Sequence, residues 1–479
     1  MVAAKLSRIA RAFCACQRAD GRQQGLLPDA DPSEPVVGSR PCGYSFVPRG
    51  RFMIPVMTLW HYWRARRLRF SSRQALEHFQ NRQLKRFARQ VLANSPYFQP
   101  YSVLPFKEWP LMDKALMMTQ FDQMNTAGLQ RDQLLVCAQR GEAERDFTPR
   151  LGRFSVGLSS GTSGQRGVFV VSPQEQQIWA GGMLAKMLPD GIFAGERVAL
   201  FLRADSNLYH SVDNRWLSLA FYDLFSPFLE QLPRLQAQAP TIIVAPAQVL
   251  RALALAVLDG QIQLDVKKVI SVAEVLDAQD RQLLNTVFRE VGEVYQATEG
   301  FLAATCAHGT LHLNEEFVHI EPQWLDEHRF TPLITDFTRS TQPIVRYRLD
   351  DVLVRQSEPC ACGQHSMAIA RIEGRRDDQL LLPDQQGGMQ IIFADLCSRA
   401  IANALPLTSD YRLIQLSKTR LQLIADCTQA ELEHGGRQLV TLFAQQGIAT
   451  DKLEWQLTVQ AVMPNFDRKR RRIVRQAEA

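Results

Sequence analysis

Apolar residues recur along the chain with helical spacing in some segments and as short continuous runs in others. Between residues 71 and 92 they fall on one face of a helix, at Leu76, Phe79, Leu84, Phe87 and Val91. Strand-like runs occur at 168–171, 197–202, 241–245, 267–272 and 294–298, and helical patterns at 246–258 and 276–290 separate some of them. Strands that alternate with helices predict an α/β fold, with a mainly parallel sheet covered by helices on both faces.

The pattern changes near residue 375. The segments 411–417 and 420–426 have the composition of strands, a helical segment follows, and residues 453–462 are again strand-like. This order of β, β, α and β predicts a small α+β domain. We therefore expect a large body over residues 53–374 and a small, mobile C-terminal domain over 375–479, with a hinge at 375–378.

Residues 1–52 show little periodicity and are rich in Gly, Pro and Arg. We expect them to be disordered or an extension outside the native fold, although the Arg-rich start is also compatible with a targeting peptide. The longest early apolar run, residues 52–60, is too short to span a bilayer, and we expect no membrane partner.

The charge and the cysteines narrow the class of protein. Residues 1–70 contain twelve Lys and Arg but only four Asp and Glu, so their net charge is +8. The net charge of the whole chain is +6, and the residues after 70 are therefore about neutral in sum. A nucleic-acid-binding protein should carry its basic surface on the folded body, so we expect no nucleic acid as partner. The nine cysteines are irregularly spaced, which favours a reducing cytoplasm over a disulfide framework. The oligomeric state is left open.

A Gly-rich segment with the sequence LSSGTSGQRG occupies residues 158–167, directly before the strand-like run. Backbone N–H groups in such a turn can converge on an anion because no β-carbon blocks the approach. The segment lacks the Gly-Lys-Ser/Thr of a Walker loop, so by itself it predicts either a phosphate-binding loop or a surface turn.

Four segments in the same order resemble motifs of the adenylate-forming superfamily, which includes acyl-CoA synthetases, peptide-synthetase adenylation domains and luciferases. They are SSGTSGQRG at 159–167, VYQATEG at 294–300, IVRYRLDD at 344–351 and IEGRRDD at 372–378. Three further segments resemble the branch of phenylacetate–CoA ligase and the deazaflavin-adenylating synthetases, and within it a clade of uncharacterised adenylate-forming enzymes. They are SVAEVL at 271–276, CAHGTLHLNEEFVHIE at 306–321 and CACG at 360–363.

The resemblance covers residues 70–475 and implies a two-step reaction. A carboxylic acid attacks ATP, with Mg²⁺, to give an acyl-adenylate and pyrophosphate, and a thiol of CoA or a carrier protein then displaces AMP. The segment 208–225 is rich in aromatic and branched residues, which favours an aryl or other apolar acid. An amine acceptor stays open. The alternative is a nucleotide-binding protein without turnover, because Gln165, Gln296 and Asp350 depart from the family pattern.

The resemblance also assigns residues to ATP. The residues of the loop that would hold the β- and γ-phosphates are Ser159, Ser160, Gly161, Thr162, Ser163 and Gly164. Arg166 could replace the charge of the Lys that the family usually has here. Tyr295 would flank adenine with Ala273 and Glu274 on its other side, Thr298 would contact the α-phosphate, and Glu299 would bind Mg²⁺.

The remaining roles concern ribose, the hinge and the catalytic lysine. Asp351 would bind the ribose hydroxyls, with Asp350 as the alternative. Arg375 would contact ribose or phosphate, and Asp377 would act as the hinge. In the segment FDRKRRRIVR at 466–475, Lys469 would approach the α-phosphate and the substrate carboxylate, and Arg468 and Arg470 are its rivals. A basic run of this kind is otherwise typical of a solvated tail.

Three cysteines and one histidine form a candidate metal site. Cys306, Cys360 and Cys362 would bind Zn²⁺ with His312 or His308, since thiolates and one imidazole suit tetrahedral zinc. The resemblance to this ligase branch implies a structural zinc here and favours His312. The other interpretation is that the cysteines are simply buried apolar residues.

Overall fold

The computed structural model describes residues 54–476, except for 145, 147–148, 159–166, 203–212, 215 and 376–378. Its central element is a mixed sheet of thirteen strands. Five neighbouring strands are parallel, in the order β6-β4-β7-β8-β9. Their bounds are β4 Glu196–Leu202, β6 Leu217–Asp223, β7 Ile242–Ala245, β8 Lys268–Ser271 and β9 Val291–Ala297. Four of them, β4, β7, β8 and β9, correspond to predicted strand-like runs, whereas β6 was not predicted and the run at 168–171 forms a strand of another sheet. The parallel strands and their helices confirm the α/β class.

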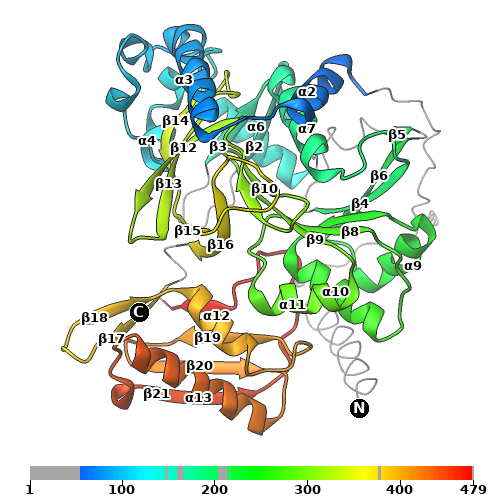
Figure 1. Cartoon of the computed structure of the whole chain (residues 1–479), viewed down its shortest axis with the longest axis vertical. Helices are drawn as coiled ribbons and strands as arrows, with labels where there is room; N and C mark the ends of the chain where they lie inside the picture. Colours follow the sequence, from blue (N-terminus) through cyan, green and yellow to red (C-terminus); the bar gives the residue numbers. More distant parts are fainter. Residues whose placement is uncertain are drawn as a thin grey trace, which may run out of the picture. The chain divides into compact units, whose positions relative to one another are not determined.

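Beyond β9 the sheet continues with antiparallel strands (Figure 1). They are β10 Gly300–Thr305, β11 Leu311–Leu313, β12 Val318–Trp324, β13 Arg329–Asp336, β14 Ile344–Arg348, β15 Asp351–Arg355 and β16 Ala368–Arg375. At the other edge β5, Asp213–Asn214, pairs antiparallel with β6. The change of direction occurs at the turn between β9 and β10, where three of the predicted site residues cluster.

Helices cover both faces of the parallel strands. Ala199 and Phe201 of β4 enter one buried core, whereas the alternating Val198 and Leu200 enter another. The first core is completed by α10 (Ala247–Leu258) and α11 (Ala278–Val287), with α9 (Phe228–Gln238) at its edge, and the second by α7 (Pro173–Met187). Figure 1 shows α10 and α11 on one side of the strands and α7 on the other.

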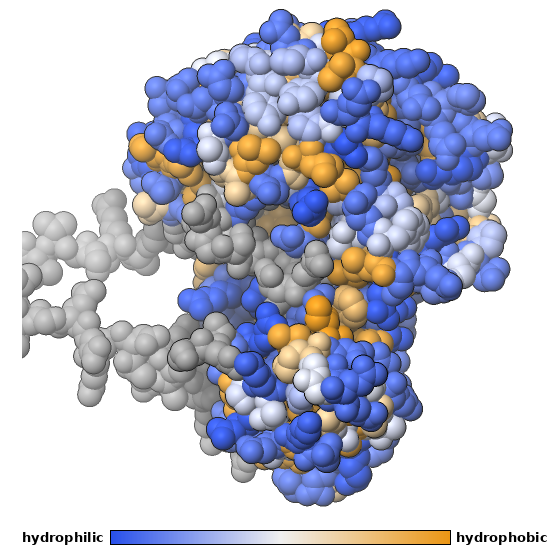
Figure 2. All heavy atoms as spheres, turned by 90° about the vertical axis from the view of Figure 1, so that its left-hand side faces the viewer, coloured by the Kyte–Doolittle hydropathy of each residue, from blue (hydrophilic) through white to orange (hydrophobic). Residues whose placement is uncertain are grey.

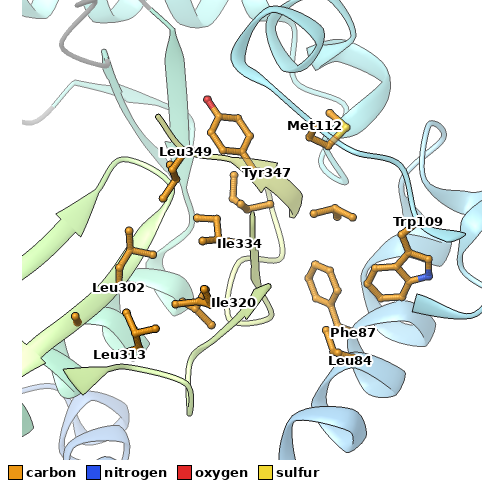
Figure 3. Packing of buried hydrophobic residues seen from close by; sticks show 14 of the residues in the cluster. Leu84, Phe87, Trp109, Met112, Leu302, Leu313, Ile320, Ile334, Tyr347 and Leu349 are labelled. Atoms are coloured by element: carbon orange, nitrogen blue, oxygen red, sulfur yellow. The ribbon is translucent and has the colours of Figure 1, made fainter. Parts of the chain in front are cut away.

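Helix α3 (Arg73–Gln90), in the N-terminal region, packs against the antiparallel half of the sheet. The apolar face predicted for residues 71–92 forms this helix, and Ser72 caps its first turn. Leu84 and Phe87 of this helix contact a cluster that includes Ile320, Ile334 and Tyr347 (Figure 3). The other helices of this region are α2 Val56–Arg67, α4 Lys114–Thr119, α5 Phe121–Met124 and α6 Arg131–Ala143. Tyr347 is therefore fixed by packing in this cluster, and it also lines the cavity described below.

A small antiparallel sheet flanks the Gly-rich segment. It consists of β1 Arg150–Leu151, β2 Phe154–Leu158 and β3 Val168–Val171. Residues 159–166 connect β2 to β3, so the predicted phosphate loop joins two adjacent strands, although the loop itself lies outside the described residues.

The C-terminal residues build a separate core. Their elements are β17 Leu380–Pro383, β18 Met389–Ile392, α12 Ala394–Ala402, β19 Tyr411–Gln415, β20 Arg420–Ala425, α13 Gln429–Gln445, β21 Glu454–Val459 and β22 Ile473–Arg475. The predicted β-β-α-β order is present as β19, β20, α13 and β21. The basic segment adds β22, which pairs parallel to β19. The domain boundary near 375 and the mobility of this part stay predictions.

No helix among the described residues is long and apolar enough to cross a membrane. On the face shown in Figure 2, hydrophobic residues form small groups on a largely hydrophilic surface.

Candidate functional site

A cavity of about 1740 Å³ is lined by seven of the residues predicted for ATP binding and catalysis. Those that line it are Ala273, Glu274, Tyr295, Thr298, Glu299, Asp351 and Lys469. They come from four segments separated by up to about 200 residues of sequence, so the sheet topology brings them together. The residues Ser159 to Gly164 and Asp377 lie outside the described part of the chain.

Tyr295 and Asp351 form a direct pair within the cavity. Tyr295 lies near the end of β9, and its hydroxyl donates a 2.6 Å hydrogen bond to Oδ2 of Asp351 at the start of β15. Asp351 in turn lies opposite Arg375 of β16 in the strand register. The predicted adenine, ribose and hinge segments are thus adjacent in space. Asp350 also lines the cavity, so the choice between the two aspartates stays a prediction.

Thr298 and Glu299 form the two-residue turn between β9 and β10, where Ala297 pairs with Gly300. Burial raises the pKa of Glu299, and the charge of Asp351 raises it further, while a hydrogen bond from Tyr347 and the charge of Arg339 partly offset this. Glu299 is therefore a half-buried carboxylate in the cavity wall, and Tyr347 and Arg339 offset the effect of burial only in part. A cation is the natural partner for such a group.

A hydrogen-bond network of Arg339 and Glu175 supports this turn. Arg339 donates to the carbonyl oxygen of Thr298 at 3.3 Å and to that of Val170 in β3 at 3.0 Å. Glu175 of α7 accepts hydrogen bonds from the backbone N–H groups of Ser340 and Thr341 at 2.6 and 2.8 Å. Burial alone would raise the pKa of Glu175, but Arg339 and these hydrogen bonds hold it below its usual value.

Sequence reasoning did not identify Glu175 or Arg339. A signal was present for Glu175, because Ser172 and Glu175 have the spacing of a capping box, and the structure forms that box at the start of α7. No local pattern marks Arg339, since its partners lie 41 and 169 residues away.

Ala273 is held in the left-handed region of backbone conformation, with φ of 65°. This costs a residue with a side chain about 1–2 kcal/mol, and such strain persists only where the surroundings enforce it. Here the next residue enforces it: Glu274 donates its N–H to the Val272 carbonyl at 2.8 Å. Its carboxylate accepts from the backbone and side chain of Gln248 at 3.2 and 2.8 Å.

The same two residues hold the backbone on both sides of Lys469. The carbonyl oxygen of Arg468 accepts a 2.8 Å hydrogen bond from the Gln248 side chain. The N–H of Arg470 donates to Oε1 of Glu274 at 3.2 Å. Lys469 thus lines the cavity beside the predicted adenine segment, whereas Arg468 is exposed and is not among the lining residues.

Arg470 and Arg472 are anchors rather than part of a solvated tail, which corrects that expectation for this basic run. Arg472 donates to Asp280 at 3.0 Å and to Asp410 at 2.8 Å, and Arg470 also pairs with Asp280. Arg251 completes the cluster with a 2.9 Å bond to Asp280. No local pattern indicates this burial, because the partners of the two arginines are about 60 to 195 residues distant.

The cluster, which we call the Asp280 network, contains three cations and three anions. Its members are Arg251, Arg470, Arg472, Asp277, Asp280 and Asp410. Burial would raise the pKa of Asp280, but the three guanidinium groups hold it well below its usual range. Asp277 also accepts the N–H of Asp280 and caps α11, so this helix presents both carboxylates.

The metal candidates are also brought together. One ligand atom from each of Cys306, His312, Cys360 and Cys362 lies within 4.8 Å of the others. His312 is buried, whereas His308 is exposed and does not belong to the group, so the structure favours His312. Cys306 directly follows β10, and His312 lies on the next strand, β11. The two other cysteines lie in a turn closed by Gly363 at φ of 71°.

The distances within this group suit a tetrahedral ion. The Sγ atoms of Cys306 and Cys360 are 3.7 Å apart, and Nε2 of His312 is 3.3 Å from Sγ of Cys362. Tetrahedral zinc with ordinary bond lengths separates two sulfur ligands by about 3.8 Å. Nδ1 of His312 lies 3.2 Å from the Ser366 carbonyl, which holds the proton on Nδ1 and leaves Nε2 as the ligand atom.

Comparison with known proteins places the fold. No protein-family model and no curated protein matches the chain. Among solved structures, 2-hydroxyisobutyryl-CoA ligase in the postadenylation state in complex with 2-HIB-AMP is similar with a TM-score of 0.64 and 14% identity, covering 87% of this chain and 92% of that one. The same ligase with 2-HIB-AMP and CoA in the thioesterification state gives 0.51 and 14%, covering 84% and 90%.

We expect replacement of Asp280 to destabilise the protein in a pH-dependent way. Asp280→Asn leaves three buried guanidinium groups with one anion fewer and should lower the free energy of unfolding by about 3–5 kcal/mol near neutral pH. The pKa of Asp280 is lower in the folded chain, so its stabilisation is complete above the unfolded-state pKa of about 3.9 and is lost as the pH falls below it. The difference between the two proteins should therefore shrink below about pH 4.

Denaturant unfolding across this pH range measures the effect. Asp265→Asn is the matched control, because Asp265 pairs with Arg289 but their side chains are 85% and 72% exposed. It should cost less than about 1 kcal/mol. Equal losses in the two variants would contradict the assignment of the Asp280 network.

At 14% identity these likenesses show architecture alone: the chain has the fold of the adenylate-forming CoA ligases.

Proposed function

We propose that the protein activates a carboxylic acid with ATP as an acyl-adenylate and transfers the acyl group to a thiol. The observation that supports this most is that one cavity contains Tyr295, Asp351, the turn at Thr298 and Glu299, and Lys469. In the first step a carboxylate oxygen bonds to the α-phosphorus and pyrophosphate leaves. In the second step a thiolate of CoA or a carrier protein bonds to the carbonyl carbon and AMP leaves.

Each residue has a role that its position supports. Tyr295 and the strained segment at Ala273 flank the adenine, and Asp351 accepts hydrogen bonds from the ribose hydroxyls. The Thr298 hydroxyl donates to the α-phosphate. Lys469 places an ammonium between the α-phosphate and the carboxylate, where negative charge gathers. The loop at 159–164 joins β2 to β3 and is assigned to the β- and γ-phosphates.

Glu299 fits a divalent cation. It is a half-buried carboxylate in the cavity wall, and burial is the main cause of its raised pKa, which the charge of Arg339 offsets only in part. Mg²⁺ that bridges ATP phosphates commonly takes only one or two protein carboxylates. When bound, Mg²⁺ would neutralise phosphate charge during adenylation.

The acid should be apolar, and the aryl class is our first choice. The cavity wall beyond Tyr295 contains side chains of α7, β4, β6 and the segment before β12. They are Trp179, Met183, Met187, Leu200, Leu219 and Phe317. A wall of this kind binds by shape and apolar contact. The neighbouring ligase in its structure binds 2-HIB-AMP and CoA, which supports an acid and CoA as partners here.

We also propose a structural zinc at Cys306, His312, Cys360 and Cys362. Three thiolates and one imidazole leave no open position, so the ion would join the β10–β11 hairpin to the turn before β16 rather than take part in the reaction. This site and the segment at 271–276 support placement in the phenylacetate–CoA ligase branch.

Carboxylate-dependent exchange of labelled pyrophosphate into ATP tests the function. We expect exchange with at least one acid in a panel of aryl and alkyl acids. ATP binding without exchange across the panel would favour the non-catalytic nucleotide-binding alternative. With a responding acid, Lys469→Ala should reduce adenylation by orders of magnitude while leaving thiol transfer from preformed acyl-adenylate largely intact.

Arg468→Ala is the matched control for Lys469, because it removes a neighbouring exposed cation that does not line the cavity. It should retain most of the exchange activity. An equal loss of both half-reactions in the Lys469 variant, or equal losses of adenylation in the two variants, would show that Lys469 does not have this role.

The zinc proposal predicts one zinc ion per chain in protein prepared without added chelator. Cys362→Ser should remove it and lower thermal stability, and Cys397→Ser, at a buried cysteine outside the group, should leave the zinc content unchanged. Metal analysis by mass spectrometry measures this. A wild-type protein that binds no zinc even after zinc is supplied during expression would contradict the proposal.

A further inference from the structure

Helix α2 is firmly attached to the body through one face. Thr58, Tyr62 and Ala65 on this face are buried. Helix α2 contacts α7 at Gly181, where an added β-carbon would lie only 2.7 Å from the backbone nitrogen of Tyr62. Arg66 extends from the helix to the carbonyl oxygens of Leu188 and Pro189 at 2.9 Å each. These contacts fix the orientation of α2 on the body, and they therefore fix which of its residues face outward.

The outward face of α2 is apolar, although it faces solvent. Val56, Trp60, Trp63 and Arg67 recur at intervals of four, three and four residues, which places them on one side of the helix. The exposed fractions of the first three are 75%, 51% and 39%, and Met57 beside them is 50% exposed. An amphipathic helix normally shows solvent the opposite pattern.

Two further aromatic residues extend this face from distant parts of the chain. The ring of Trp63 lies 6.3 Å from that of Phe193, and Phe193 lies 6.2 Å from Trp216. Both Phe193 and Trp216 are exposed. We call the combined surface the aromatic face, and its members are Val56, Met57, Trp60, Trp63, Phe193 and Trp216. Such contiguous exposed apolar groups mark an interaction site more often than single exposed residues do.

Two arginines of α2 lie at the aromatic face. The guanidinium of Arg64 lies 5.5 Å from the Trp60 ring centre, and that of Arg67 lies 5.3 Å from the Trp63 ring centre. Between residues 56 and 90 the chain has nine Lys and Arg and one Glu, a net charge of +8, while the whole chain carries +6. The pKa of Arg64 is lowered by burial and by the charge of Arg86 on α3, so the cations of the two helices act on each other.

This charge selects the partner. A second copy of the chain would bring two strongly positive surfaces together, which disfavours self-association through this face. A nucleic acid would match the charge but would leave the aliphatic side chains of Val56 and Met57 without an apolar partner. An anionic lipid surface matches both, because Trp prefers the membrane interface, aliphatic groups enter the acyl region, and Arg pairs with phosphate.

We propose that the aromatic face of α2 binds the surface of a membrane that contains anionic lipids. The sequence led us to expect no membrane partner, because no segment is long enough to span a bilayer. The proposed binding differs from that expectation, since a face that lies along the bilayer surface needs no spanning segment. The buried face of α2 reaches the cavity wall, since Thr58 lines the cavity together with Trp179 and Met183 of α7. A membrane-bound protein would thus hold the cavity one helix away from the bilayer, where apolar acids partition. The binding itself does not depend on the proposed reaction.

Sedimentation of the full chain with vesicles tests the proposal. The vesicles contain either phosphatidylcholine alone or phosphatidylcholine with phosphatidylglycerol. We expect binding to the anionic vesicles, weakened by salt. The double variants Trp60→Ser with Trp63→Ser, and Arg64→Gln with Arg67→Gln, should each reduce the apparent affinity about tenfold or more.

The controls remove similar groups elsewhere on the surface. Trp324→Ser removes an exposed tryptophan, and Arg289→Gln with Arg420→Gln removes two exposed cations. Both should bind as the wild type does, and the melting temperature of each protein shows whether it is folded. Absence of binding to anionic vesicles overturns the proposal, as does undiminished binding by folded variants of the aromatic face. Binding to an RNA homopolymer or to an acidic protein that needs these residues, without vesicle binding, overturns it too.

Discussion

The placement of the C-terminal segment depends on the burial of three guanidinium groups around Asp280. Isolated charges would not tolerate this environment, but Arg251, Arg470 and Arg472 are matched by three carboxylates, so the cluster is close to neutral. The anchored arginines lie one and three residues after Lys469. Gln248 and Glu274 also hold the backbone on both sides of Lys469. The network and these two residues together determine where the lysine enters the cavity.

The same network bears on the expected movement of the C-terminal domain. A rotation between the half-reactions would separate Arg470 and Arg472 from Asp277 and Asp280, and water would then solvate all four groups. Ion pairs of this kind gain little net energy over hydrated charges, because desolvation offsets most of their attraction. A neutral, well-paired cluster can thus specify one arrangement of the segment without making it irreversible. The second support, formed by Arg339 and Glu175, holds the turn at Glu299 within the body and is unaffected by such a rotation.

The sequence allowed the α/β class and the positions of several elements to be predicted, because strands such as β7 and helices such as α3 carry their spacing locally. The order of the sequence motifs identified Tyr295, Glu299, Asp351 and Lys469 as candidates. In the structure all four line one cavity. Contacts between distant segments could not be predicted. Arg470 and Arg472 have the composition of a solvated tail, and only their distant partners bury them. The antiparallel half of the sheet and the role of Arg339 depend on such contacts as well.

The central step of the proposed reaction is the bond that a carboxylate oxygen forms to the α-phosphorus of ATP. An acid that supports pyrophosphate exchange can be labelled with oxygen-18 in its carboxyl group and incubated with the protein, ATP, Mg²⁺ and CoA. Mass spectrometry of the released AMP then decides the question. We expect AMP that carries labelled oxygen from the acid, because the carboxyl oxygen stays on phosphorus when the thiol attacks the carbonyl carbon. Unlabelled AMP would show that the acid is not activated as an adenylate and would contradict the central claim.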